Sequence, residues 1–408
     1  MLKLLHTADI HLDSPLKSLV LRDPDLAEQA ATATRVALSR IVDAAIAENV
    51  AAVLIAGDLF DGQQRSARTG AFVIAEFDRL RDRAIRVFCI RGNHDAENPI
   101  SGAIDLPDNV HVFDGRGGRV RLTDDVWIHG VSFAQRRAPE SLLPKFGPPV
   151  PGAVNIGMLH SSLAGAAGHD VYAPCTPAEL AAHGFDYWAL GHVHRRQIHA
   201  TAPWIVMPGT PQGRDMGETG PKSATLITID GGISVAEVPT SVLEFVAIDL
   251  PVPGDDGDDA LRDAIRARLR AAAQALQSDF GAVRLTLTGQ SPRRWQILRD
   301  RDMWAETARG IARETGRLWL EKLVIDIAPG SAAGQGATDE LGRIMDLIRA
   351  EEGFRADARA RLEALLAELP APRRAALVAD EAALAALAAR LAAAGAERVL
   401  ARMKGGSR

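Results

Sequence analysis

The sequence predicts an α/β fold, and two observations support this prediction. From residue 1 to about residue 240, short runs of Val, Leu, Ile and Ala alternate with segments of helical periodicity, which is typical of α/β proteins. The chain has 408 residues, of which 47% are hydrophobic, so it can fill the cores of two or three domains. We therefore expect a multidomain α/β protein.

The first 240 residues are expected to form strands that are followed by helices or polar loops. Helices are expected near 25–48 and 66–83. The expected strands are, in chain order, "LKLLHTAD", "AAVLIAGD", "IRVFCIRGNHD", "VNIGMLH" and "DYWALGHVH". The stretch 108–134 is expected to form hairpins, because "DGRGG" has the glycine-rich chemistry of a turn between strands.

A second unit is expected over 241–330. The strand-like segments "EFVAIDLPV", "AVRLTLTG" and "LWLEKLVIDIAP" alternate in it with helices over 260–277 and near 298–315. The acidic "PGDDGDD" can cap the first of these helices. This order predicts a small βαβαβ domain.

The last part of the chain has a different composition. A linker rich in Gly, Ala and Ser covers 330–337, and Ala, Leu, Arg and Glu dominate from 338 to 408. Apolar residues at helical spacing predict a helical tail, which Pro370 and Pro372 should divide.

Charge and cysteine content exclude several classes of protein. A net charge of −5 excludes a protein that coats nucleic acid with its whole surface, so a polyanion would be met by local basic patches. Cys89 and Cys175 form no CxxC pair, so neither a disulfide framework nor a cysteine zinc site is expected. No apolar run approaches the roughly 18 residues of a membrane-spanning helix, and we expect a cytoplasmic protein.

Potential metal ligands follow five of the expected strands. They are, in chain order, Asp9, His11, Asp58, Asn93, His94, His160, His192 and His194. In open α/β folds, side chains beyond the carboxyl ends of strands form the ligand site. Each residue alone is a weak signal, because an Asp after a strand is usually a cap or a turn residue. Together they predict a site for divalent ions such as manganese, iron, zinc or magnesium.

The spacing of these residues suits two ions. The carboxylate of Asp58 can bridge ions about 3.5–4 Å apart, which can activate water and offset charge on a phosphoryl group. Asn93 would supply an oxygen without adding negative charge. The DxH and HxH spacings would place both side chains on one face if the chain is extended there.

The motifs "DIH", "GDLFD", "GNHD", "HSS" and "GHVH" resemble the five motifs of calcineurin-like metallophosphoesterases. "HTADIHLDSPL" and "GHVHRRQ" are similar to segments of the SbcD-like DNA repair nucleases, and especially of their YhaO-like branch. The resemblance implies a four-layer metallophosphoesterase sandwich over 1–240, a small α/β capping domain over 241–330 and a helical C-terminal tail over 338–408 that could bind an ATPase.

The resemblance also implies a role for each site residue. One ion would be held by Asp9, His11, Asp58 and His194. The other would be held by Asp58, Asn93, His160 and His192. His94 would act on the leaving oxygen as a general acid or would stabilise the transition state, and Asp61 would orient its ring. For Asp61, a helix cap or a loop hydrogen bond is the alternative.

By resemblance, the expected function is that of a DNA nuclease with two divalent ions, most simply Mn²⁺, in a repair complex with an SbcC-like coiled-coil ATPase. A homodimer is left open. Four arginines are candidate contacts for the DNA backbone, with solvated surface charge as the alternative: Arg195, Arg196, Arg293 and Arg294.

Other functions share the same motifs. A phosphomonoesterase or a small-nucleotide phosphodiesterase would use the same ligands, because the motifs specify the metals and not the leaving group. A protein phosphatase is disfavoured, because the second motif continues as "DGQ" and not as "DRG". A binding protein with a vestigial site is disfavoured, because no ligand position is substituted. The tail could also simply pack on its own domain.

Overall fold

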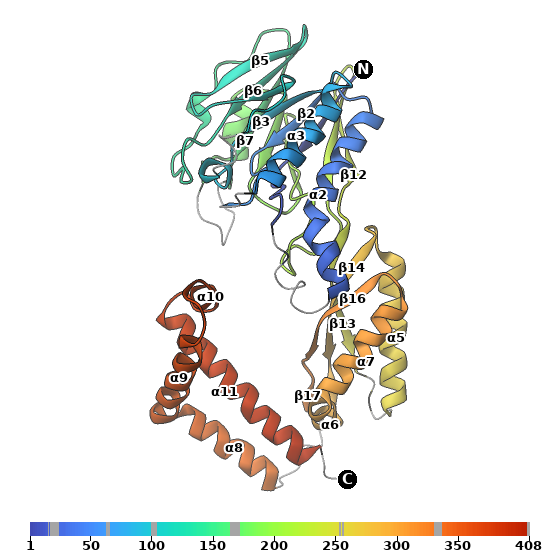
Figure 1. Ribbon diagram of the computed structural model, residues 1–408, viewed down its shortest axis with the longest axis vertical. Helices are drawn as coiled ribbons and strands as arrows, with labels where there is room; N and C mark the ends of the chain where they lie inside the picture. Colours follow the sequence, from blue (N-terminus) through green and yellow to red (C-terminus); the bar gives the residue numbers. More distant parts are fainter. Residues whose placement is uncertain are drawn as a thin grey trace. The chain divides into compact units, whose positions relative to one another are not determined.

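The computed structural model describes residues 1–14, 16, 24–62, 66–98, 104–163, 172–252, 254, 257–329 and 337–405 (Figure 1). The linker expected over 330–337 lies outside the described residues, except for its last residue, which begins a helix. The described chain divides into two compact units. The first comprises 1–247, 272–283 and 317–321, and the second comprises 248–271, 284–316 and 322–408.

The described part of the first unit contains two six-stranded mixed sheets. One sheet has the order β12-β11-β1-β2-β3-β4 and consists of β1 (Leu2–Thr7), β2 (Ala52–Ala56), β3 (Arg86–Ile90), β4 (Val110–Val112), β11 (Ser223–Ile229) and β12 (Ile233–Pro239). The other has the order β5-β6-β7-β8-β10-β9 and consists of β5 (Gly118–Thr123), β6 (Val126–Val131), β7 (Val154–His160), β8 (Tyr187–Gly191), β9 (Gln197–Thr201) and β10 (Trp204–Met207).

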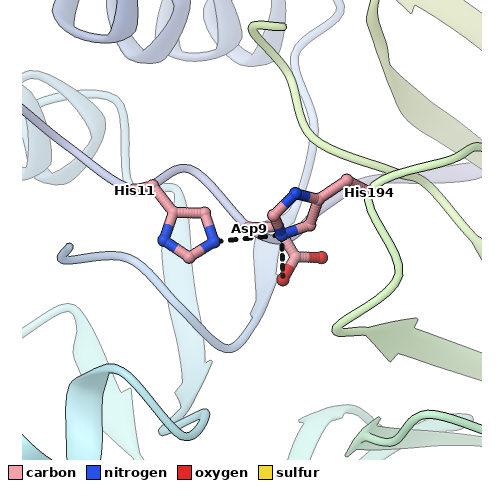
Figure 2. Close-up of side chains that lie close together, drawn as sticks. All are labelled: Asp9, His11 and His194. Carbon is pink, nitrogen blue, oxygen red and sulfur yellow. Dashed lines mark hydrogen bonds and ion pairs between the residues drawn. The ribbon is translucent and has the colours of Figure 1, made fainter. Parts of the chain in front are cut away.

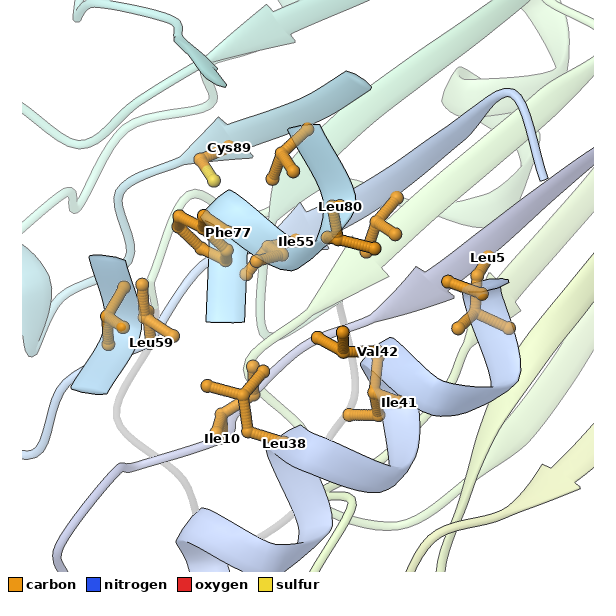
Figure 3. Close-up of a cluster of buried hydrophobic side chains, with 14 of the residues drawn as sticks. Leu5, Ile10, Leu38, Ile41, Val42, Ile55, Leu59, Phe77, Leu80 and Cys89 are labelled. Atoms are coloured by element: carbon orange, nitrogen blue, oxygen red, sulfur yellow. The ribbon is translucent and has the colours of Figure 1, made fainter. Parts of the chain in front are cut away.

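Both faces of the central strands of these sheets are buried, which explains why β2, β3, β7 and β8 are nearly continuous apolar runs. Helices α2 (Pro24–Ala47) and α3 (Ala67–Arg81) cover the outer face of the first sheet. Figure 3 shows Ile41 of α2 and Phe77 of α3 in the core against Ile55 of β2. Because side chains alternate along a strand, the neighbouring Leu54 points to the opposite face.

The opposite face of the first sheet packs on the second sheet. Leu54 and Phe88 share a buried cluster with Ile128, Met158 and Ala189. On the far side of the second sheet, another cluster joins its strands to α4 (Pro177–Ala182) and nearby loops. The layers are helix, sheet, sheet and helix, which confirms the predicted α/β class and four-layer sandwich.

The expected hairpins in 108–134 are only partly present. β5 and β6 form an antiparallel hairpin, but its turn is at 124–125. The "DGRGG" segment instead leads from β4, which pairs with β3, to β5 in the other sheet. Gly117, with φ of 81°, permits the left-handed backbone of this crossing.

Over residues 243–329 the main strands and helices follow the expected order. A three-stranded sheet has the order β13 (Leu243–Pro251), β14 (Phe280–Thr288) and β16 (Leu318–Ile325). The first helix, α5, covers Asp258–Ala275. The second expected helix is two helices, α6 (Arg294–Arg299) and α7 (Arg301–Glu314), which meet at Asp300. The short strands β15 (Gln290–Ser291) and β17 (Ala328–Pro329) pair with each other.

The tail is helical, as predicted. Its helices are α8 (Ala337–Ala350), α9 (Glu352–Ala367), α10 (Ala371–Leu377) and α11 (Glu381–Lys404). Pro370 is the residue before α10, which agrees with its expected role as a break. Within the second unit α11 packs on α6, where Lys404 lies 4.8 Å above the ring of Trp295 and Glu397 pairs with Arg294.

Candidate metal centre

The carboxyl ends of parallel strands bring the predicted ligands together. β1, β2 and β3 are parallel in the first sheet, and β7 and β8 are parallel in the second. Asp9 and His11 follow β1, Asp58 follows β2, and Asn93 with His94 follows β3. His160 ends β7, and His192 with His194 follows β8. Since β2 also contacts β7 and β8, the two sets of strand ends face each other.

The backbone at these positions is not extended, which contradicts the argument from DxH and HxH alternation. Asp9, His11, Asp58 and His192 have φ of 53°, 45°, 53° and 102°. Such left-handed residues cost roughly 1–3 kcal/mol each and need support from their surroundings. The N–H of Asp9 donates to the carbonyl of Gly57, and that of His11 donates to Asp58, both at 3.0 Å. The side chains therefore converge because two tight loops are hydrogen-bonded to each other.

Asp9, His11 and His194 form the first group of possible ligands (Figure 2). The Nε2 atoms of His11 and His194 are 3.2 Å apart, and Nε2 of His194 lies 3.9 Å from Oδ1 of Asp9. The carboxylate of Asp9 is fully buried and accepts the backbone N–H of His192 at 2.9 Å. One carboxylate and two imidazole nitrogens thus point at a common position.

Asp58 belongs to a second group with His160 and Asp9. Its Oδ2 lies 3.4 Å from Nε2 of His160 and 3.9 Å from Nε2 of His11. Nδ1 of His160 donates to the carbonyl of Ala56 at 3.0 Å, which turns Nε2 toward Oδ1 of Asn93, also at 3.0 Å. The ring of His192 lies 5.1 Å from that of His160. Asp58 therefore lies between the two groups.

The buried charges of this centre compensate one another. Although burial opposes ionisation, the imidazoles of His160 and His11 hold the pKa of Asp58 well below its usual range. Burial works against the charged ring of His160 as well, but the carboxylates of Asp58 and Asp9 raise its pKa to about 9. Burial lowers the pKa of His192 to about 4. A centre of this kind binds cations at the expense of protons.

Two glycines leave room for the ligands. A Cβ atom on Gly92 would lie 2.2 Å from Oδ1 of Asp58, and one on Gly57 would lie 2.5 Å from Nδ1 of His160. Gly57 also has φ of 93°, which other residues rarely adopt. The glycines of "GDLFD" and "GNHD" are therefore needed for close packing around Asp58 and His160.

His94 and Asp61 lie at the edge of the centre. The backbone N–H of His94 donates to Oδ1 of Asp58 at 2.9 Å, and its ring is 4.8 Å from that of His11. Oδ1 of Asp61 is 3.5 Å from Nδ1 of His11 and 3.8 Å from Nδ1 of His94. Asp61 thus lies between the two rings, closer to His11. It does not cap α3, whose N-cap is Ser66.

Three charged residues were not predicted from the sequence. Glu218 accepts Nδ1–H of His194 at 2.6 Å, and Arg214 lies 3.2 Å from the same carboxylate oxygen. Burial opposes the charge of Glu218, but His194 and Arg214 lower its pKa to about 2. Asp95 is buried and accepts the backbone N–H groups of Leu59, Phe60 and Gly92. Asp95 is the last residue of the GNHD motif, whereas Glu218 and Arg214 lie in a loop without a recognisable motif.

A cavity of about 850 Å³ opens onto the centre. Its lining residues are Asp58, Asn93, His94, His192, Val193, His194, Arg195, Arg214, Asp215, Gly217, Glu218, Thr219 and Lys222. The lining contains three cations, Arg195, Arg214 and Lys222, beside three carboxylates, and Arg214 is paired with Glu218.

The four arginines predicted to contact DNA differ in their surroundings. Arg195 is exposed and lines the cavity. Arg196 donates to Thr225 at 2.5 Å and pairs with Glu237 at 3.1 Å. Arg293 pairs with Asp258, and Arg294 pairs with Glu397 and donates to the carbonyl of Ile327. The last two side chains are only 13% and 17% exposed.

Among the described helices, none is both long enough and apolar enough to cross a lipid bilayer.

Comparison with known proteins gives related matches for two parts of the chain. Residues 2–196 match the family model described as calcineurin-like phosphoesterase, and residues 245–328 match the one described as metallophosphoesterase YhaO, middle domain. The uncharacterized metallophosphoesterase YhaO of Bacillus subtilis is 36% identical over 241 residues, which cover 57% of this chain and 58% of YhaO.

More distant proteins match as well. The DNA double-strand break repair protein Mre11 of Sulfolobus acidocaldarius is 25% identical over 317 residues, which cover 73% of this chain and 78% of that protein. A solved dimetal phosphatase from Danio rerio is 11% identical, with a TM-score of 0.36, over 59% of this chain and 98% of that chain. The sequence resemblance is confirmed: the chain carries a calcineurin-like phosphoesterase domain followed by a YhaO-type middle domain, and it is homologous to YhaO and to the DNA double-strand break repair protein Mre11.

Proposed function

We propose that the chain is a metal-dependent DNA nuclease that hydrolyses phosphodiester bonds at a dinuclear site. The observation that carries this proposal is the position of Asp58, whose Oδ2 lies 3.4 Å from His160 and 3.9 Å from His11. A buried carboxylate between two groups of imidazoles is suited to bridging two cations. The donors are carboxylate, imidazole and amide oxygen, which fit divalent ions such as Mn²⁺.

In this proposal each residue has one task. Asp9, His11 and His194 hold one ion, Asn93, His160 and His192 hold the other, and Asp58 binds both. When bound, the ions stabilise negative charge on the phosphoryl group and supply a nucleophile from water at neutral pH. His94 lines the cavity and donates a proton to the leaving oxygen. Asp61, whose Oδ1 lies 3.8 Å from Nδ1 of His94, orients the ring of His94.

DNA is the proposed substrate because of the homology to Mre11 and the cations in the cavity. Arg195 and Lys222 can meet phosphates next to the one that reacts. We further propose that residues 1–240 form the nuclease domain, that 241–330 form a capping domain that contacts DNA, and that 338–408 bind a coiled-coil ATPase. The pairing of Arg293 and Arg294 with acidic residues makes Arg195 the better candidate for a DNA contact.

The test is a parallel assay of substrates. Purified protein with Mn²⁺ is incubated with labelled duplex DNA, with single-stranded DNA, with bis-p-nitrophenyl phosphate and with p-nitrophenyl phosphate, alone and with its ATPase partner. We expect cleavage of DNA and of the diester, and loss of both in Asp58→Asn. Rapid turnover of the monoester without cleavage of DNA would instead identify a phosphomonoesterase.

Arg195 allows a finer test of DNA binding. Arg195→Gln should weaken DNA binding and reduce its salt dependence by the equivalent of about one phosphate contact. Hydrolysis of the small diester should be unchanged, because Arg195 belongs to neither proposed set of metal ligands. An equal loss of activity on DNA and on the small diester would show that Arg195 contributes to catalysis and not to DNA binding.

A further inference from the structure

We infer that Glu218 is a positioning residue that keeps the proton of His194 on Nδ1, so that Nε2 is available to a metal ion. The inference rests on the metal centre of the proposed function but not on the identity of its substrate. Glu218 and His194 are 24 positions apart, and no motif joins them.

The two nitrogens of His194 face different surroundings. Nε2 points toward Oδ1 of Asp9 and Nε2 of His11, which are the predicted ligands. Nδ1 lies 2.6 Å from Oε1 of Glu218, a carboxylate oxygen that can only accept. The hydrogen bond therefore requires the proton on Nδ1. In metal sites, a carboxylate behind the imidazole commonly fixes the ring and its tautomer in this way.

Because Arg214 is close by, the tautomer of His194 depends on its hydrogen bond to Glu218. Its Nη2 lies 2.9 Å from Nδ1 of His194 and 3.2 Å from Oε1 of Glu218. A guanidinium can only donate, so in the present arrangement both donors share the carboxylate oxygen. Without Glu218, Arg214 would donate to Nδ1 of His194 instead. That bond needs a lone pair on Nδ1, which moves the proton to Nε2 and blocks the ligand position.

Glu218 also contacts the backbone of Arg214, because Oε2 of Glu218 accepts the backbone N–H of Arg214 at 2.8 Å. A loss of metal in a Glu218 variant could therefore have two origins, a changed tautomer or a disordered loop. The origins are separable. The tautomer effect depends on the guanidinium of Arg214, whereas the loop effect does not.

A double-variant cycle distinguishes the changed tautomer from the disordered loop. The affinity of each variant for Mn²⁺, without DNA, is measured by isothermal titration calorimetry. Glu218→Leu should weaken one of the two Mn²⁺ sites by about 10–100-fold, which is the usual effect of losing such a partner. Arg214→Leu should bind Mn²⁺ nearly as the wild type does, because the bond from His194 to Glu218 remains. The double variant Glu218→Leu/Arg214→Leu should recover most of the lost affinity. A double variant as weak as Glu218→Leu would overturn the inference.

The tautomer can be measured directly in the metal-free protein. Long-range ¹H–¹⁵N spectra of histidine-labelled protein, assigned with His194→Gln, should show the proton of His194 on Nδ1 in the wild type and on Nε2 in Glu218→Leu. The same tautomer in both proteins would overturn the inference. The spectra involve neither metal nor DNA.

A matched control is Glu237→Gln, which removes a carboxylate that pairs with Arg196 elsewhere in the same domain and is 64% exposed. Its Mn²⁺ affinity should equal that of the wild type, and a loss comparable to that of Glu218→Leu would count against a specific role of Glu218. Wild-type protein that binds no Mn²⁺ would refute the metal centre and this role together. Protein that binds two ions without cutting DNA would refute only the proposed substrate.

Discussion

His94 contacts the candidate metal centre in two ways. Its backbone N–H holds Asp58, while its ring lines the cavity and is 34% exposed. A side-chain substitution keeps the first contact and removes the second. The ring also lies within reach of the ligand atoms of His11 and Asp58, so it could itself bind an ion. The proposed role and the ligand role differ in their consequences.

We predict that His94→Ala keeps two bound Mn²⁺ ions but loses turnover by about 10²–10⁴-fold, the usual contribution of a general acid. The ions should remain because the amide that orients Asp58 belongs to the backbone. Metal content by elemental analysis and hydrolysis of the small diester check the two halves of this prediction. If the folded variant bound fewer ions, His94 would be a ligand.

His6 should make the stability of the first unit sensitive to acid. It is fully buried in β1, where its ring contacts the hydroxyl of Tyr187 and the carbonyl of Leu190. Burial lowers the pKa of His6 from 6.5 to about 3. Between these two pH values the unfolded chain binds more protons than the folded chain. The contribution of His6 is therefore complete above pH 6.5 and is lost as the pH falls toward 3.

We predict that the free energy of unfolding of the wild type falls with acidification more steeply than that of His6→Gln. The difference in slope should approach roughly 1.4 kcal/mol per pH unit below pH 6. Guanidinium unfolding at a series of pH values, with a chelator present to remove metal effects, measures both slopes. Parallel curves would show that His6 is not buried in its neutral form.

At the scale of elements, the loops after β2 and β3 must approach each other closely, and Gly92 leaves the room that Asp58 and His160 need. Gly92→Ala would place a methyl group 2.2 Å from Oδ1 of Asp58. We predict that this variant loses metal binding and about 1–3 kcal/mol of stability, which is typical of overpacking. Mn²⁺ titration and thermal unfolding measure the two effects. The matched control is Gly147→Ala, where the added Cβ meets no atom within 4 Å and both properties should be retained.

Local sequence patterns predicted the strands of the site but not the loops between them. The apolar runs before Asp9, Asp58 and Asn93 predicted their strands, because buried strands need continuous hydrophobic residues. The placing of "DGRGG" in a hairpin was wrong, because local turn chemistry does not tell which sheet receives the next strand. The partnership of Glu218 with His194 depends on a loop fold that no periodic pattern records. The left-handed backbone of Asp9 and His11 was missed for the same reason.

At the scale of the whole chain, every proposed ligand lies at or before residue 194, and the tail lies far beyond it. We predict that truncation after residue 336 leaves hydrolysis of a small diester unchanged and abolishes co-purification with the proposed coiled-coil ATPase. It should also uncover α6, because α11 covers Trp295, and this should change the tryptophan fluorescence. A full-length control, Glu397→Gln, loses only the ion pair to Arg294 and should keep the ATPase. An ATPase complex that survives truncation would assign the tail to internal packing.

The position of β1 in its sheet has a consequence for the newly synthesised chain. β1 lies between β2, to which it is close in sequence, and β11, which begins at Ser223. Closing so long a loop is slow, because its entropy is lost before the pairing compensates for it. Until the ribosome has released residues 223–229, β1 is an open edge that carries apolar side chains, and such edges pair with other chains. The strand that leads to Asp9 and His11 therefore stays open to pairing with other chains until β11 has been synthesised.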